Sequence, residues 1–98
     1  MDKIDLKHTA SGLKAAWLSM PVGRAAGANI EVVRMDASRY PNEVHEFVEA
    51  LLVLEGQLNL EIEVETVCVG AGEVAMVPAG QAHAVAPGSY GTLVIIDQ

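Results

Sequence analysis

Residues 72–83 read GEVAMVPAGQAH, a stretch whose punctuation predicts two short strands joined by a tight turn. The apolar run from Glu73 to Val77 has strand length and is bounded by turn residues on both sides. The sequence Pro78-Ala-Gly80 predicts the turn, and Gly80 supplies a backbone angle that residues with a side chain resist. We expect His83 to begin the next strand.

The rest of the chain is divided by Gly and Pro into pieces of similar length. Residues 29–35 and 92–96 are short runs rich in β-branched residues, and residues 58–64 alternate strictly between apolar and polar, which predicts a half-buried strand. Between residues 50–54 and Leu58, the sequence Glu55-Gly56-Gln57 predicts a hairpin with Gly56 at its turn. Roughly seven to nine strands with closely spaced turns indicate an all-β sandwich or barrel.

The N-terminal stretch allows two interpretations. Either Thr9 or Ser11 caps a short helix that carries Leu13 and Trp17, or the chain leads into a first strand from Trp17. The 98 residues contain no internal repeat, low-complexity tract or linker, which predicts a single domain over residues 1–98. Residues 1–15 are expected to form an N-terminal arm that is mobile or a short helix.

The charge of the chain is unevenly distributed. The formal net charge is −7, all six Lys and Arg lie at or before Arg39, and nine carboxylates follow it. An acidic chain repels phosphate backbones, so nucleic acid is not an expected partner. No apolar run is long enough to span a bilayer and no secretion signal is visible, so we expect a cytoplasmic protein without a membrane partner. Cys68, the one cysteine, is expected to be a small buried hydrophobe in a strand.

Ionisable side chains alternate along residues 43–49, which read EVHEFVE. On an extended strand residues two apart share one face, and this face leads directly into the expected core. It carries, in order, Glu43, His45, Phe47 and Glu49. Ionisable groups on a core-facing side are costly unless they are paired or bind a metal. The alternatives are a solvated rim for the two glutamates and an ordinary core or rim position for His83.

Together these two segments resemble the two motifs of the cupin superfamily. The first motif is His-x-His, three or four residues, Glu, six residues and Gly; His45, Glu49 and Gly56 match it, and Glu43 stands at the first His. The second motif is Gly, five residues, Pro-x-Gly, two residues, His, three residues and Asn. This second motif is matched at every spacing as far as its histidine, which is His83, whereas Pro87 stands at the Asn position.

The resemblance implies a small single-domain cupin, with the double-stranded β-helix fold also called a jelly-roll barrel. It implies that His45, Glu49 and His83 bind one divalent transition metal inside the barrel. This metal is Mn, Fe, Ni, Co or Zn. Glu43 is then either a fourth ligand or a catalytic base. The resemblance further implies a small-molecule ligand and a homodimer that covers the open edge strands.

Two functions of different classes follow from this site. The first is a metal-dependent enzyme that acts on a small polar metabolite, of the dioxygenase, isomerase or lyase and decarboxylase type. The second is a non-catalytic module that binds or senses a small metabolite. Phe47 and Met76 are candidates for the pocket wall, with core packing as the alternative. Tyr40 and Arg39 are candidates for contact with a substrate carboxylate, with an exposed loop as the alternative.

Overall fold

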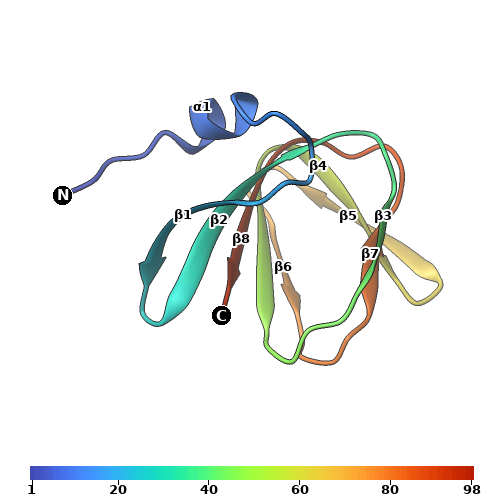
Figure 1. Ribbon diagram of the computed structural model, residues 1–98. Coiled ribbons are helices and arrows are strands. Elements are labelled where there is room, and N and C mark those ends of the chain that lie inside the picture. Colours follow the sequence, from blue (N-terminus) through green and yellow to red (C-terminus); the bar gives the residue numbers. More distant parts are fainter.

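The chain forms eight strands and one short helix in the computed structural model, which describes residues 1–98 (Figure 1). Most of the strands are rich in β-branched and aliphatic residues. The elements are α1 (Leu6–Ser11), β1 (Met20–Ala25), β2 (Ala28–Met35), β3 (Tyr40–Glu43), β4 (Glu49–Ile62), β5 (Glu65–Gly70), β6 (Val74–Val77), β7 (His83–Val85) and β8 (Tyr90–Asp97). The predicted all-β architecture and strand number are confirmed. The one helix has six residues, and no helix is long and apolar enough to cross a membrane.

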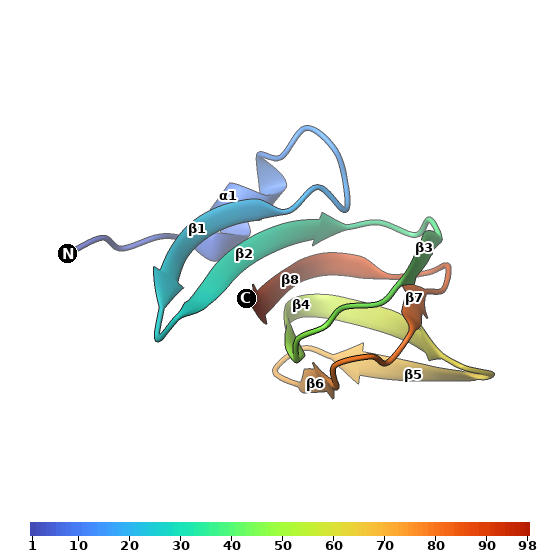
Figure 2. The same ribbon diagram turned by 60° about the horizontal axis from the view of Figure 1, so that its bottom comes forward.

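All strand pairs are antiparallel and belong to one curled sheet. Its order is β1-β2-β8-β4-β7-β3, and β5 and β6 each pair with β4. The curl brings β3 and β7 round to face β2 and β8, so that all four strands line one interior cavity (Figures 1 and 2). The fold is therefore the β-barrel that the sequence predicts, and its interior is where a site can be enclosed.

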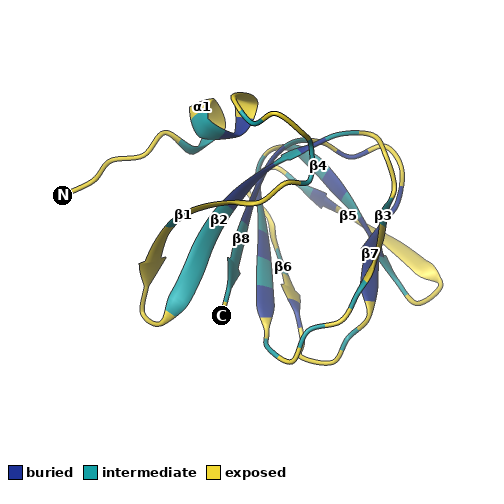
Figure 3. Ribbon diagram, in the orientation of Figure 1, coloured by how far each residue is buried: buried dark blue, intermediate teal, exposed yellow.

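The barrel wall is built from aliphatic side chains of six strands. Figure 3 shows the buried residues concentrated on the central strands, while β1 and the tip of the β4–β5 hairpin are exposed. Leu58, Leu60 and Val53 are almost completely inaccessible. The core cluster consists of Val33, Met35, Leu51, Val53, Leu58, Leu60, Val69, Val77, Val85 and Leu93.

The predicted hairpin at Gly56 is wrong, because β4 runs through this position without turning. The register of β4 against β8 shifts between Val53 and Glu55. The buried side chains accordingly change from odd positions, such as Val53, to even positions, such as Leu58. A bulge that inserts one residue has this effect on a strand, since side chains alternate with a period of two.

Gly56 and Gly91 face each other across the β4–β8 ladder at this irregularity. Their φ angles are 81° and 98°, in the left-handed region that favours glycine. A Cβ atom on Gly91 would lie 2.0 Å from the backbone oxygen of Glu55, and one on Gly56 would lie 2.1 Å from that of Tyr90. The two strands can approach this closely only because both positions lack a side chain.

The N-terminal arm includes the helix, which begins earlier than predicted. Asp5, rather than Thr9 or Ser11, caps α1, because its carboxylate accepts a hydrogen bond of 3.0 Å from the backbone N–H of His8. The first strand begins at Met20, not at Trp17. Trp17 lies between them; its indole N–H donates to Asp36 over 2.9 Å, and its ring packs beside Tyr40.

The expectation that Cys68 is buried is wrong. Cys68 lies on β5 opposite Asn59 of β4, and its side chain is exposed. Only Val69 of this strand is buried, because β5 pairs with β4 alone and extends beyond the barrel wall.

Candidate metal centre

Two of the four predicted ligands face each other across a strand pair. Glu43 is the last residue of β3, and the ladder places it directly opposite His83, the first residue of β7. One ligand atom from each of Glu43, His45 and His83 lies within 4.8 Å of the other two. The sheet topology therefore joins residues from the two sequence motifs, which lie 40 positions apart between Glu43 and His83.

The segment between Glu43 and Glu49 is a loop, not the continuous strand that we predicted. β3 ends at Glu43 and β4 begins at Glu49, so the alternation of faces does not hold between them. The loop is held by the second motif, because the backbone N–H of Gly80 donates to the carbonyl oxygen of His45 over 2.8 Å. Phe47 stacks on the His45 imidazole with 4.9 Å between ring centroids. These two contacts orient His45 toward the cluster.

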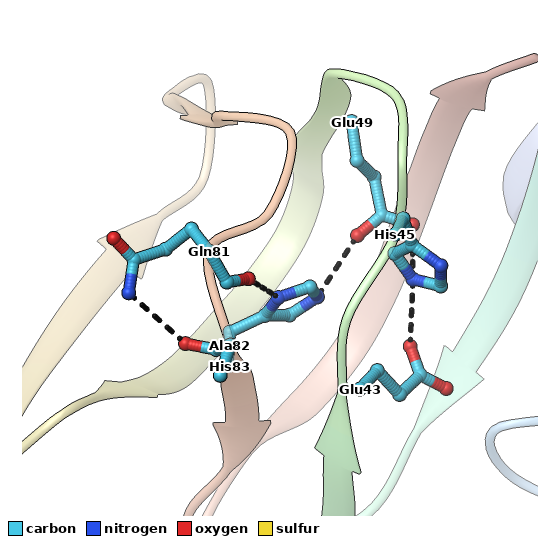
Figure 4. Close-up of polar contacts among 6 residues, drawn as sticks. All are labelled: Glu43, His45, Glu49, Gln81, Ala82 and His83. Atoms are coloured by element: carbon cyan, nitrogen blue, oxygen red, sulfur yellow. Dashed lines mark hydrogen bonds and ion pairs between the residues drawn. The ribbon is translucent and has the colours of Figure 1, made fainter.

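Glu49 links the two histidines (Figure 4). One carboxylate oxygen lies 3.1 Å from Nε2 of His83, and the other lies 3.7 Å from Nε2 of His45. Nε2 of His45 also lies 3.2 Å from a carboxylate oxygen of Glu43. All four predicted side chains thus form one contiguous group, with both Nε2 atoms turned toward carboxylates.

His83 is held in one tautomer by the backbone. Its Nδ1 lies 3.0 Å from the carbonyl oxygen of Gln81, which can only accept a hydrogen bond, so Nδ1 carries a proton (Figure 4). A divalent cation bound between them would replace any proton that Nε2 and the Glu49 oxygen share. The contact with Gln81 then leaves Nε2 free as the ligand atom.

Burial raises the pKa of the Glu49 carboxyl above its ordinary value. The nearby imidazoles of His45 and His83 pull this pKa in the opposite direction, and the Glu43 carboxylate raises it further. Glu49 is 5% exposed, so its charged form has little contact with water. A carboxylate in this position is costly without a cation beside it, which fits a metal ligand.

The cluster lies on the wall of a cavity of about 230 Å³ inside the barrel. Tyr40 lines this cavity. Two carboxylates that the sequence analysis did not single out, Glu31 and Asp97, also line it. The full set of lining residues is Trp17, Ser19, Glu31, Val33, Tyr40, Glu43, His45, Glu49, Leu51, Leu58, Leu60, His83, Val85, Leu93, Ile95 and Asp97.

Neither Phe47 nor Met76 is among the residues that line this cavity. Met76 pairs with Ala50 on β4, whereas Val77 pairs with Glu49, so Met76 points to the opposite face of the sheet from Glu49. Its side chain is 61% exposed, so the expected places in the pocket wall and in the core are both wrong. Phe47 acts on the site only through its stacking on His45.

Arg39 is not in the cavity either. Its guanidinium donates to the Glu61 carboxylate over 2.8 Å, and the Arg39 side chain is 58% exposed. The predicted contact between Arg39 and a substrate carboxylate therefore has no support in the fold. The alternative, an exposed position, holds.

The structure is an eight-stranded antiparallel barrel, and two histidines and two glutamates cluster on its inner wall. These features define a small barrel protein with a candidate metal site. The sequence model of the cupin domain family matches residues 30–97, which is more than half of the chain. The chain therefore belongs to the cupin family.

Comparison with solved structures supports the same fold. A cupin-2 domain containing protein from Shewanella frigidimarina is similar with a TM-score of 0.85 and 19% identity, over 95% of this chain and 91% of that one. A protein from Neisseria meningitidis is similar with a TM-score of 0.83 and 23% identity, over 98% of both chains. A protein from Thermus thermophilus gives 0.80 and 23%, over 99% of this chain and 96% of that one. No curated protein sequence matches the chain.

We expect metal occupancy to fall as the pH is lowered. Both imidazoles must be neutral and Glu49 must be ionised to bind a cation. Because the pKa of Glu49 is raised, protons compete for it at a higher pH than for an ordinary carboxylate. Occupancy should be nearly complete at about pH 7.5 and mostly lost at about pH 5. Elemental analysis after dialysis at each pH measures it, and equal occupancy would argue against histidine ligands.

Proposed function

We propose that the protein is a metal-dependent cupin enzyme that acts on a small polar metabolite. In this proposal Glu43, His45, Glu49 and His83 hold one divalent transition metal. The observation that carries it is the convergence of these four side chains on the wall of the cavity inside the barrel. Two imidazoles with one or two carboxylates suit Mn, Fe, Ni, Co or Zn.

The side chains of the site have distinct tasks in this proposal. A bound cation supplies Lewis acidity and a place for a substrate oxygen. His83 and Glu49 are the rigid members, since both are about 95% buried and His83 is fixed by Gln81. Tyr40 and the aliphatic side chains of the wall exclude water around the substrate. These properties suit dioxygenase, isomerase or lyase and decarboxylase chemistry on a molecule that fits the cavity.

Glu43 is the member best suited to move a proton. Its side chain is 40% exposed, compared with 26% for His45 and 7% for Glu49, so it can turn between the cation and the cavity. Its carboxylate lies 3.2 Å from Nε2 of His45, within reach of a group bound beside that histidine. A carboxylate that accepts a proton from a bound substrate acts as a general base.

Two substitutions of Glu43 test this role. Glu43→Gln should retain most bound metal, since three ligands remain, but should lower turnover of a substrate by about 100-fold or more because the amide cannot accept a proton. Glu43→His restores the usual cupin ligand set and should bind the metal several-fold more tightly, because imidazole is the stronger ligand for these ions. Calorimetric metal titration and assays with a candidate substrate measure both effects.

Glu46→Gln is the matched control for Glu43, because Glu46 lies in the same loop and is exposed. This variant should equal wild type in metal affinity and turnover. If Glu43→Gln and Glu43→His also equal wild type, Glu43 lies outside the centre and the ligands are His45, Glu49 and His83 only.

A second function, a non-catalytic module that binds a small metabolite, is favoured by the composition of the cavity wall. The wall carries no Lys or Cys, and the only hydroxyl groups are those of Ser19 and Tyr40. The wall therefore offers no thiol or amine that could act as a nucleophile. Binding of a metabolite without turnover by the metal-loaded protein would support this module. Homodimer formation and a cytoplasmic location stay predictions under either function.

A further inference from the structure

Apart from the two histidines of the cluster, every charged side chain that lines the cavity is acidic. Glu31 and Asp97 join the two proposed ligands Glu43 and Glu49, and no Lys or Arg lines the wall. Arg34 donates to the backbone oxygen of Leu13, so it is engaged outside the cavity, as Arg39 is. Four ionised carboxylates would outweigh the charge of one divalent cation and would leave a negative excess in the cavity with metal bound.

The sheet register places Glu31, Asp97 and Glu49 next to one another on the inner face. Glu31 of β2 pairs with Ile95 of β8, so Asp97, two residues further along β8, is its diagonal neighbour on the same face. On the other side of β8, Ile96 pairs with Ala50 at the end of the ladder, so Asp97 and Glu49 are the next residues of the two strands at this end. The acidic surface is therefore continuous from Glu31 to the metal centre.

One carboxylate oxygen of this acidic surface has no partner in the protein. The Oδ1 atom of Asp97 is buried and has no hydrogen-bond partner, and it is the only buried side-chain oxygen or nitrogen in the protein in that condition. Burial, and then the charges of Asp97 and Glu49, raise the pKa of Glu31. Buried carboxylate oxygens without a partner are costly, so an occupant that donates hydrogen bonds and carries positive charge is favoured here.

We propose that the cavity selects a small organic cation, whose ammonium group is held by Glu31 and Asp97 while an oxygen at its other end reaches the metal centre. The metal-facing end rests on the proposed function, whereas the ammonium site does not require a metal. An organic cation suits this place better than a second metal, because the only group of three metal-ligating atoms in close reach is that of Glu43, His45 and His83. Aliphatic side chains such as Ile95 and Leu51 line the cavity between the polar groups and suit the carbon chain of such a molecule.

Three probes of matched length test this selectivity: aminopropanol, propanediol and hydroxypropionate, which carry a positive, a neutral and a negative end. Isothermal titration calorimetry of the Zn²⁺-loaded protein near neutral pH gives their affinities. Aminopropanol should bind at least about tenfold more tightly than propanediol, because hydrogen bonds to a charged group are worth about 1.5–3 kcal/mol. Hydroxypropionate should be the weakest.

The same titrations on variants locate the ammonium site. Glu31→Gln and Asp97→Asn should each reduce the preference for aminopropanol over propanediol by about tenfold. Glu65→Gln removes the same charge from an exposed position on β5 and should leave the preference unchanged. Circular dichroism checks that each variant is folded.

Several outcomes would overturn the proposal: no binding of aminopropanol by wild type, equal or tighter binding of hydroxypropionate to the metal-free protein, in which its carboxylate has no Zn²⁺ to bind, or an unchanged preference in both pocket variants. Titration of the metal-free protein separates this proposal from the proposed function. If Zn²⁺ does not bind but the amine preference persists, the metal centre fails and the ammonium site stands. If Zn²⁺ binds without an amine preference, only the ammonium site fails.

Discussion

His83→Ala and His45→Ala should each lower the affinity for a divalent transition metal by at least about 100-fold. Loss of a residue that merely orients a ligand costs about 10- to 100-fold in metal affinity, so loss of a ligand itself should cost more. The His83 imidazole is nearly inaccessible and is held by the Gln81 carbonyl, so no neighbouring side chain can replace it. Competition titration against a chromophoric chelator measures the affinity.

His8→Ala is the matched control, because His8 is the only other histidine and is exposed on α1. This variant should bind metal as wild type does. His83→Ala also removes a buried side chain, so thermal unfolding must confirm that it is folded at the temperature of the titration. Wild-type affinity in folded His45→Ala and His83→Ala would remove both residues from the proposed centre.

Gly91→Ala should lower the free energy of unfolding by at least about 3 kcal/mol, a large share of the roughly 5–15 kcal/mol that stabilises a domain. The new Cβ would lie 2.0 Å from the Glu55 oxygen and 2.9 Å from Cα of Gly56, both backbone atoms of β4. The two strands must separate to accept it, which disturbs the ladder where β4 changes register. Urea denaturation followed by circular dichroism measures the change.

Gly72→Ala separates the clash from the cost of the backbone angle. Gly72 has a φ of 83°, close to that of Gly91, but a Cβ there would meet nothing within 4 Å. Its cost should be about 1–2 kcal/mol, which is the strain of a left-handed angle alone. Equal losses in Gly91→Ala and Gly72→Ala would show that close packing of the two strands is not what requires Gly91.

The sequence was sufficient to predict the barrel and the four side chains of the cluster. The spacing of the two motifs reflects the geometry of the barrel, because each turn glycine and each proposed ligand has a fixed position relative to the end of a strand. The residues that the motifs name, such as His45 and His83, were therefore found although our picture of the backbone between Glu43 and Glu49 was wrong.

Local patterns failed where tertiary pairing decides the outcome. Gly56 gives the same signal for a hairpin turn as for a bulge in a continuous strand, and only the pairing with Gly91 distinguishes them. The sequence allows the pocket wall or the core for Met76, and only its pairing with Ala50 of β4 shows that it lies in neither. The wrong prediction for Cys68 has the same cause, since the face that a strand buries depends on the strands beside it.

Glu31 and Asp97 were missed for a related reason. Glu31 lies among apolar residues of β2, two positions before Val33. Residues two apart on a strand share one face, and this spacing is the signal that could have placed Glu31 inside the barrel. Nothing in the sequence indicates that β2 and β8 are adjacent, so the pairing that brings Asp97 beside Glu31 could not be foreseen. The charge of the cavity is a property of the sheet topology.

In the proposed centre, one divalent metal binds to Glu43, His45, Glu49 and His83. Elemental analysis of protein purified without a chelating tag, and again after equilibration with Mn, Fe, Ni, Co or Zn followed by dialysis, tests it most directly. We predict close to one equivalent of a single divalent ion per chain, lost on treatment with a chelator. Less than about a tenth of an equivalent of every ion after loading would contradict the metal centre and the function proposed from it.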